Sequence, residues 1–462
     1  MRDPERSKRS GRRFRWSVGL LGIAVFAITT LRTGPPPVIE MTSDLPGIGR
    51  HTEIQITVSE PVRGLSSYRV ELIQADQVTL LEEERFTPRE PWRFWGAAES
   101  DASLTVTVGS EVMEGLQSGE AVVRTTAGRA GTWLRHPSAV VHELSLPVQL
   151  IPPSLQVISS QHYLVAGGCE AVVYRVGEGA VIDGVQVGDQ WFPGNPLEGG
   201  LPGQRFALFA APFDLSDAKE VRLVAVDNVK NRRELGFVDR LKSVKISTDT
   251  IRVSDSFMEK VVPEILAATP SLKDRGSLID NYLAINRELR LENARRLTSL
   301  GDSSVAKFSW TRTFQSMPNA KVMSSFADRR TYMYMGQEVD RQVHLGFDLA
   351  SVRQAEVPAA NSGVVVLAEY FGIYGNAVVL DHGYGLMSLY GHLSSIAVTT
   401  GQSVEAGETV GRTGATGLAG GDHLHFTMLL RGVAVNPLEW WDHGWIRDRL
   451  VRKLGASLNY QG

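Results

Sequence analysis

Alternating apolar and polar positions run through the first half of the chain and predict β-strands. The four clearest segments are residues 53–58, 68–73, 103–108 and 142–151. Side chains of a strand point alternately to its two faces, so this period of two predicts sheets with one buried face. Two prolines interrupt the pattern at residues 152–153, and a second block of the same kind follows. Each block is predicted to form a small β-sandwich.

Apolar positions take helical spacing between residues 249 and 303, which predicts a helical connector. The repeating positions are Leu278, Tyr282, Ile285 and Leu289. We interpret this stripe as a packing face, and Gly301 is expected to end the helix. Ser256 and Glu259 have the spacing of a capping box, so an earlier helix is expected to begin at Ser256.

Strand and glycine-turn patterns return after the connector, so the chain is predicted to be mostly β. The predicted parts are 1–37 (basic cytoplasmic tail, membrane helix and proline hinge), 38–151 and 152–248 (β-sandwiches), 249–303 (connector) and 304–462 (a β-rich catalytic domain). The stretch "EVRLVAVDNVKNRR" near the end of the second block resembles the closing strand and turn of immunoglobulin-like modules.

The N-terminal segment has the pattern of a membrane anchor. Seven Arg and Lys against two acids precede the uncharged run Trp16–Leu31, and a proline hinge follows at residues 34–37. Basic residues before an apolar run indicate that the rest of the chain is exported. We therefore expect a single-pass inner-membrane protein with its catalytic domain in the periplasm, or otherwise outside the cytoplasmic membrane. A cleaved signal peptide is the alternative, and it places the domains on the same side.

Composition narrows the candidate chemistry. The net charge is −3 and the basic residues are spread along the chain beyond the N-terminus, so no nucleic-acid partner is expected. Cys169 is the single cysteine, which excludes an internal disulfide and a cysteine-based metal site. It is expected to be a small buried side chain. Any metal ion must therefore be held by histidine and carboxylate.

Histidines gather in the last 160 residues, which hold six of the ten. "HLGFD" contains His344 and Asp348, "LYGHL" contains His392, and "GDHLHF" contains His423 and His425. Residues i and i+2 of a strand share a face, so His423 and His425 are expected to enter one pocket. The two other histidines of this part, His382 and His443, are expected to be structural.

Two histidines and an aspartate would form the three-ligand set of a catalytic zinc ion, which keeps one position open. Zinc lowers the pKa of bound water to about 7, which makes a nucleophile available at neutral pH. A set of this kind leaves two histidines for proton transfer and for stabilising the oxyanion.

Three motifs in the order H-x-x-x-D, Tyr-x-His and H-x-H resemble those of the lysostaphin-type (LytM-like) zinc metallopeptidases, over roughly residues 305 to 440. By this resemblance His344, Asp348 and His425 are the ligands of one zinc ion, and His392 and His423 are the catalytic pair. The family usually has Phe-Gly-x-Arg before the first motif. Here Ala327 stands in the glycine position.

The resemblance implies a zinc endopeptidase in which metal-bound water attacks peptide crosslinks of peptidoglycan, with stem peptides as substrate. The β modules would act as spacers and could bind cell-envelope proteins. A silent or autoinhibited regulator, which binds the wall or activates cell-wall amidases, is the alternative. A peptidase that acts on proteins outside the wall would use the same residues. The cleaved bond stays open, although a D-alanyl–diaminopimelate crosslink fits an anchored enzyme better than a glycine bridge.

Overall fold

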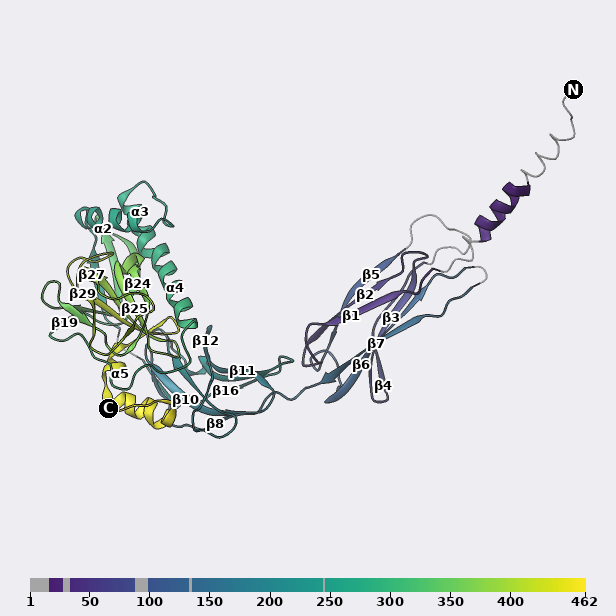
Figure 1. Cartoon of the computed structure of the whole chain (residues 1–462), viewed down its shortest axis with the longest axis horizontal. Coiled ribbons are helices and arrows are strands. Elements are labelled where there is room, and N and C mark those ends of the chain that lie inside the picture. The colour runs from purple at the N-terminus through teal and green to yellow at the C-terminus, as the bar shows by residue number, and fades with distance from the viewer. Residues whose placement is uncertain (1–15, 28–33, 88–98, 133–134, 244–245) are drawn as a thin grey trace, which may run out of the picture. The chain divides into compact units, whose positions relative to one another are not determined.

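The chain is mostly β, as predicted, and divides into two compact units (Figure 1). The first unit ends at Pro153 and also takes in Val226–Arg232, and the second comprises Ser154–Ala225 and Arg233–Gly462. The structure is a computed structural model. It describes residues 16–27, 34–87, 99–132, 135–243 and 246–462.

The N-terminal region contains a helix over residues 16–27, whose side chains are almost all exposed. The predicted basic tail and the end of the predicted anchor, residues 28–31, lie outside the described residues. Within the part that is described, no helix has both the length and the apolar character needed to cross a membrane.

The first unit holds two antiparallel sheets. One has the order β1-β2-β5 and the other β4-β3-β6-β7. Their strands are β1 (Val38–Ser43), β2 (Thr52–Ser59), β3 (Leu65–Gln74), β4 (Gln77–Arg85), β5 (Asp101–Val108), β6 (Gly119–Arg129) and β7 (Val140–Val148). Ile54, Ile56 and Val58 of β2 are buried while the residues between them are exposed, so the alternating pattern does select the core face.

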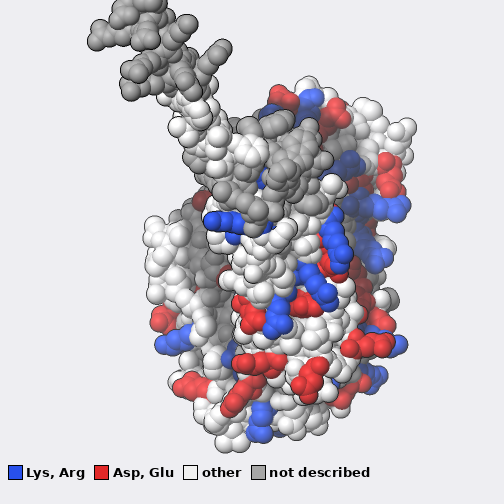
Figure 2. All heavy atoms as spheres, turned by 90° about the vertical axis from the view of Figure 1, so that its right-hand side faces the viewer, with Lys and Arg blue, Asp and Glu red and all other residues white. Residues whose placement is uncertain are grey.

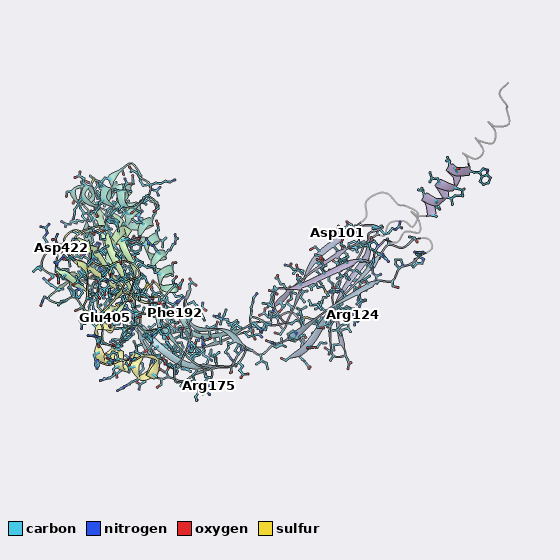
Figure 3. All side chains as sticks on the ribbon, viewed as in Figure 1. Asp101, Arg124, Arg175, Phe192, Glu405 and Asp422 are labelled. Atoms are coloured by element: carbon cyan, nitrogen blue, oxygen red, sulfur yellow. The ribbon has the colours of Figure 1, made fainter. Side chains whose placement is uncertain are left out.

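Charges on the first unit are mixed in sign. Arg124 of β6, which is labelled in Figure 3, pairs with Glu143 of β7 at 2.7 Å. Basic and acidic side chains are interspersed over the face shown in Figure 2.

The second unit begins with two four-stranded sheets, in the orders β13-β14-β10-β8 and β12-β11-β15-β16, beside a small two-stranded sheet β17-β9. Their strands are β8 (Leu155–Val157), β9 (Tyr163–Val165), β10 (Cys169–Val176), β11 (Ala180–Val187), β12 (Gln190–Pro193), β13 (Asn195–Pro196), β14 (Gln204–Ala210), β15 (Val221–Asp227), β16 (Arg232–Leu235) and β17 (Arg240–Lys242). A 3-10 turn, η1 (Ala218–Glu220), precedes β15. Residues of both four-stranded sheets share one buried cluster.

The connector joins the C-terminal domain by a strand before it becomes helical. Strand β18 (Thr248–Arg252) pairs in parallel with β20 (Asp328–Tyr334), which pairs with β21 (Gln337–His344). The helical elements that follow are α2 (Asp255–Ala268), α3 (Leu278–Ala284), the π-helical turn η2 (Ile285–Leu289) and α4 (Arg290–Asp302). Tyr282, Ile285 and Leu289 are buried, as expected of a packing face.

The predicted start of the first helix at Ser256 is wrong. Ser254 is the N-cap residue, and its hydroxyl accepts a hydrogen bond from the Phe257 N–H at 3.2 Å. Val253, the residue before the N-cap, is buried. The helix therefore begins two residues earlier than the capping-box spacing indicates. Ser256 therefore lies inside the first turn.

The last part of the chain is built on an eight-stranded sheet with the path β19-β22-β30-β26-β25-β24-β28, and β31 pairs with β30. Its strands are β19 (Lys321–Ser324), β22 (Phe347–Ala350), β24 (Gly363–Tyr370), β25 (Asn376–Asp381), β26 (Leu386–Leu393), β28 (Ser403–Val404), β30 (Leu424–Leu430) and β31 (Val433–Val435). A small sheet contains β23 (Glu356–Pro358), β27 (Ser395–Ile396) and β29 (Thr409–Arg412). A 3-10 turn, η3 (Gly372–Tyr374), connects β24 and β25.

The C-terminal helical elements pack against the second β module within the same unit. They are α5 (Pro437–Trp441), α6 (His443–Ile446), η4 (Arg447–Val451), α7 (Arg452–Leu454) and η5 (Gly455–Ser457). Lys453 pairs with the buried Glu170 of β10 at 2.8 Å. The Cys169 N–H donates to Glu439 at 2.7 Å, and Cys169 itself is buried as expected.

Candidate active site

Three side chains that can hold a metal ion meet at the ends of three strands. His344 is the last residue of β21, and Asp348 and His425 are direct partners in the antiparallel pair β22–β30. Cross-strand partners project from the same face of a sheet. His344 Nε2 lies 2.9 Å from Asp348 Oδ1 and 3.1 Å from His425 Nδ1, and the third pair of atoms is 3.0 Å apart. The fold thus brings residues 81 positions apart into one triangle.

This donor set fits a zinc ion. The three ligand atoms of His344, Asp348 and His425 all lie within 4.8 Å of one another. Zinc–nitrogen and zinc–oxygen bonds of about 2.0–2.2 Å in a tetrahedral site place neighbouring ligand atoms about 3.3 Å apart. The observed separations are close to this value, and imidazole and carboxylate are both donors that zinc accepts.

Hydrogen bonds orient both ligand histidines. The Nδ1–H of His344 donates to the Ser325 carbonyl at 3.0 Å, which leaves the Nε2 lone pair directed at the triad. The Thr427 hydroxyl donates to the Leu345 carbonyl at 2.9 Å, so its oxygen accepts the Nε2–H of His425 at 3.0 Å. His425 therefore presents Nδ1 to the site. Outer hydrogen bonds of this kind fix the tautomer of metal-binding histidines.

A bulge directs His392 into the site. Gly391 pairs with His425 across β26 and β30, so simple alternation would turn the next side chain to the opposite face. The pairing of β25 with β26 shifts register at this point, and His392 has a φ of +63°. Its ring then lies 4.9 Å from that of His423 and 5.7 Å from that of His425, centroid to centroid. Its Nδ1–H donates to the Thr416 carbonyl at 2.9 Å.

His423 is held at the entrance to β30. The preceding residue, Asp422, accepts a hydrogen bond from the Thr413 hydroxyl at 2.6 Å and anchors this loop (Figure 3). The Nδ1–H of His423 donates to the Gly421 carbonyl at 2.8 Å, and its Nε2 lies 3.5 Å from Asp348 Oδ1. His423 and His425 thus reach the same carboxylate oxygen, in keeping with the i, i+2 spacing.

The site concentrates negative charge on Asp348. Burial alone would raise the pKa of this carboxyl, but the close approach of the His344, His423 and His425 rings lowers it well below its ordinary value. Arg330 adds an ion pair to Oδ2 at 3.1 Å. Burial lowers the pKa of His425 to about 4 and that of His392 well below 6.5. Burial opposes the charged form of His423 too, but Asp348 beside it raises the pKa of His423 overall.

All five predicted residues line one cavity of about 440 Å³. The sequence pattern did not predict that the connector supplies part of its wall, through Phe257, Tyr282 and Arg290. Tyr282 belongs to the apolar stripe, which indicated only packing. Tyr374 was also missed, and its ring lies 5.5 Å from that of His425. No spacing rule connects these positions, because they meet only when the connector packs on the C-terminal sheet.

The two remaining histidines of this domain lie outside the cavity lining. His382 is fully buried and forms hydrogen bonds of 2.8 Å to the Ser362 carbonyl and the Ser388 hydroxyl. Burial lowers its pKa to about 4. His443 is exposed and contacts the Tyr460 hydroxyl at 2.8 Å. His382 thus has the structural surroundings that were expected of it, whereas His443 is not packed in the interior.

Ala327 takes a backbone conformation that favours glycine. Its φ is +67°, it is buried, and its N–H donates to the His344 carbonyl at 2.7 Å. A residue with a Cβ atom is strained in this left-handed region. The departure from the glycine of the resembling family therefore retains the turn beside a proposed ligand and adds strain to it.

Three protein donors with further histidines beside them are typical of a catalytic zinc site, which keeps one position open. Residues 342–437 match the sequence model of Peptidase family M23, and this part of the chain is a domain of that family.

Curated relatives carry related names. The peptidoglycan DD-endopeptidase ShyA of Vibrio cholerae is 30% identical over 251 residues, which are 53% of this chain and 52% of the relative. The DD-carboxypeptidase/endopeptidase Mpg of Neisseria meningitidis is 38% identical over 97 residues, covering 21% of this chain and 22% of Mpg. The murein hydrolase activator EnvC of Escherichia coli is 39% identical over 95 residues, covering 21% and 23%. The matches thus span about half of the first relative and less than a quarter of the other two.

Proposed function

We propose that this protein is a zinc-dependent endopeptidase that hydrolyses peptide crosslinks of bacterial peptidoglycan. The observation that carries the proposal is the triangle of His344, Asp348 and His425, which lies in one cavity with His392 and His423. Membership of the C-terminal domain in Peptidase family M23 supports peptide-bond hydrolysis. The names of ShyA and Mpg support a peptidoglycan substrate.

The residues of the site divide into those that would hold the zinc ion and those that would transfer protons. A bound zinc ion would supply Lewis acidity and a hydroxide nucleophile at neutral pH. His392 and His423 each donate Nδ1–H to a backbone carbonyl, which leaves Nε2 of both rings to exchange protons. One ring can take the proton of the attacking water, and a protonated ring can deliver a proton to the leaving amine. The burial of His392 keeps competing water away from this exchange.

A regulator of other wall enzymes is the second candidate function. The match to the murein hydrolase activator EnvC favours it. The complete set of five site residues favours the enzyme, because a protein that acts only by docking needs no metal donors or proton-transfer groups. An autoinhibited enzyme lies between these two, and it is supported by the wall that Phe257 and Tyr282 of the connector form beside the site.

The enzyme is held at the inner membrane by the segment Trp16–Leu31, with its catalytic domain in the periplasm. Support comes from the uncharged run itself and from the seven basic residues that precede it. The β modules act as spacers between the membrane and the wall, and their surfaces are available to cell-envelope proteins.

Digestion of purified peptidoglycan by the full-length protein tests the proposed function. Fragments are identified by mass spectrometry, with and without a chelator, for the wild type, His425→Ala and His443→Ala. We expect release of cleaved crosslinks that the chelator and His425→Ala abolish. The exposed His443 lies outside the cavity lining, so His443→Ala should behave as the wild type. Zinc binding without any release would contradict a constitutively active enzyme and would favour the regulator or the autoinhibited enzyme.

A further inference from the structure

The cavity is lined by more positively charged than negatively charged side chains. Besides the histidines, its lining contains Arg252, Arg290 and Arg330, whereas Asp348 is its one acidic residue among those the structure describes. Arg330 is paired with Asp348 at 3.1 Å. No acidic side chain of the described residues forms an ion pair with Arg252 or Arg290. The cavity thus presents two arginines without a counter-ion beside the proposed metal site.

Arg290 is held in place by a buried network. It begins α4, directly after the π-helical turn η2. Its Nε donates to the Asn286 carbonyl at 3.1 Å and its Nη2 to the Asn286 side-chain oxygen at 2.7 Å. Asn286 is fully buried and donates to Asp340 at 2.7 Å, and Asp340 also accepts from Arg287 at 2.9 Å. Arg287 neutralises Asp340, so the network orients Arg290 without neutralising it.

The chemistry of this arrangement suits a carboxylate ligand. A guanidinium group matches the planar geometry of a carboxylate and can bind it through two parallel hydrogen bonds. A cavity of about 440 Å³ holds only a short stretch of peptide. A carboxylate that reaches Arg290 must therefore belong to a residue close to the scissile bond.

We propose that Arg290, assisted by Arg252, binds a free carboxylate of the substrate next to the scissile amide and so selects acidic crosslinks over neutral ones. The inference rests on the proposed function and names the substrate class of the same site. A D-alanyl–diaminopimelate crosslink carries such a carboxylate on the carbon next to the scissile nitrogen. A glycine bridge has none, and amidation of the carboxylate removes its charge.

Two crosslinked peptide dimers that differ only at this carboxylate test the inference. One carries the free acid and the other the carboxamide, and kcat and KM are measured for the wild type, Arg290→Gln and Arg295→Gln. Arg295 is exposed on the same helix and outside the cavity lining, so it is the matched control. We expect the wild type and Arg295→Gln to prefer the acid by roughly 10- to 100-fold, chiefly in KM, as the loss of a charged hydrogen bond predicts. Arg290→Gln should show almost no preference.

Binding of uncrosslinked stem peptides separates this inference from the proposed function, because these peptides contain no crosslink to cleave. Titration calorimetry with the acid and carboxamide forms should give the same preference, and Arg290→Gln should abolish it. Equal binding of both forms by the wild type would overturn the inference even if both dimers are cleaved. Failure to cleave either dimer would overturn the proposed function, while the binding ratio still decides the inference.

Arg252→Gln provides a second test of the inference in case Arg290→Gln does not fold. Arg252 is exposed on β18, and its side chain makes no hydrogen bond or ion pair with the other described residues, so its replacement should leave the fold intact. A partial loss of the preference for the acid supports the inference. If Arg290→Gln melts like the wild type and keeps the full preference, the inference is wrong.

Discussion

Asp348 and His425 are direct cross-strand partners, and Asp348 Oδ1 lies 3.0 Å from His425 Nδ1. The pairing of β22 with β30 sets this contact, so the register of two strands determines the spacing of two proposed ligands. A shift of one residue would turn one of the two side chains to the opposite face. The pairing of these two strands therefore fixes the positions of these two proposed ligands relative to each other.

Replacing His392 should separate metal binding from turnover. His392→Asn removes the ring, and asparagine tolerates the φ of +63° better than alanine does. We expect the bound zinc to be retained and the rate of crosslink hydrolysis to fall by about 10²- to 10⁴-fold, the usual contribution of a general acid or base. Metal analysis and fragment release measure the two quantities. Full activity of this variant would show that the assigned role is wrong.

Thr427 should influence zinc affinity without touching the metal. Thr427→Val keeps the shape of the side chain but removes the acceptor for the His425 Nε2–H. The histidine can then adopt the other tautomer, and we expect zinc affinity to fall by about 10- to 100-fold. Competition with a chromophoric chelator measures this affinity. Thr250→Val, at an exposed position of β18, is the control, and equal affinities of the two variants would contradict the prediction.

Ala327→Gly should stabilise the protein. A residue with a Cβ atom at positive φ destabilises the fold by about 1–2 kcal/mol. Glycine removes this strain but destabilises the fold by about 0.5–1 kcal/mol, because it makes the unfolded chain more flexible. A net gain of about 0.5–1 kcal/mol is expected in the free energy of unfolding, measured by chemical denaturation. Ala368→Gly, on strand β24 with no positive φ, should instead destabilise the protein. If both variants change the free energy of unfolding in the same direction, the inferred strain at Ala327 is wrong.

Glu439 should make stability depend on pH. Its carboxyl accepts the Cys169 N–H, and burial raises its pKa to about 8, with Glu170 adding to the shift and Arg449 opposing it. The folded state therefore holds a proton that the unfolded chain releases near pH 4.5. The stabilisation is complete below about pH 4.5 and is lost as the pH rises through about 8.

Glu439→Gln isolates this effect, because glutamine keeps the acceptor and cannot ionise. Denaturation midpoints of the wild type and of Glu439→Gln should converge at low pH. The wild type should become progressively less stable than the variant between about pH 4.5 and 8. Curves that stay parallel over this range would show that Glu439 does not titrate as described.

Local patterns predicted the mostly β class and the identity of the five clustered residues. Strand alternation is a property of a few consecutive residues, so the buried face of β2 follows from its sequence alone. The shared target of His423 and His425 follows from the same rule. The spacing of the helical stripe likewise predicted the buried Tyr282, Ile285 and Leu289. The roles assigned to the five residues stay predictions.

Only the tertiary structure decided how these residues meet. His392 joins the cluster because β25 and β26 shift register, and a bulge depends on the partner strand as much as on its own residues. Ser254 rather than Ser256 caps the first connector helix because the neighbouring Val253 is buried. Arg290 enters the cavity because the connector packs on the peptidase sheet. These features arise from contacts between distant segments, whose free energies no local period of the sequence encodes.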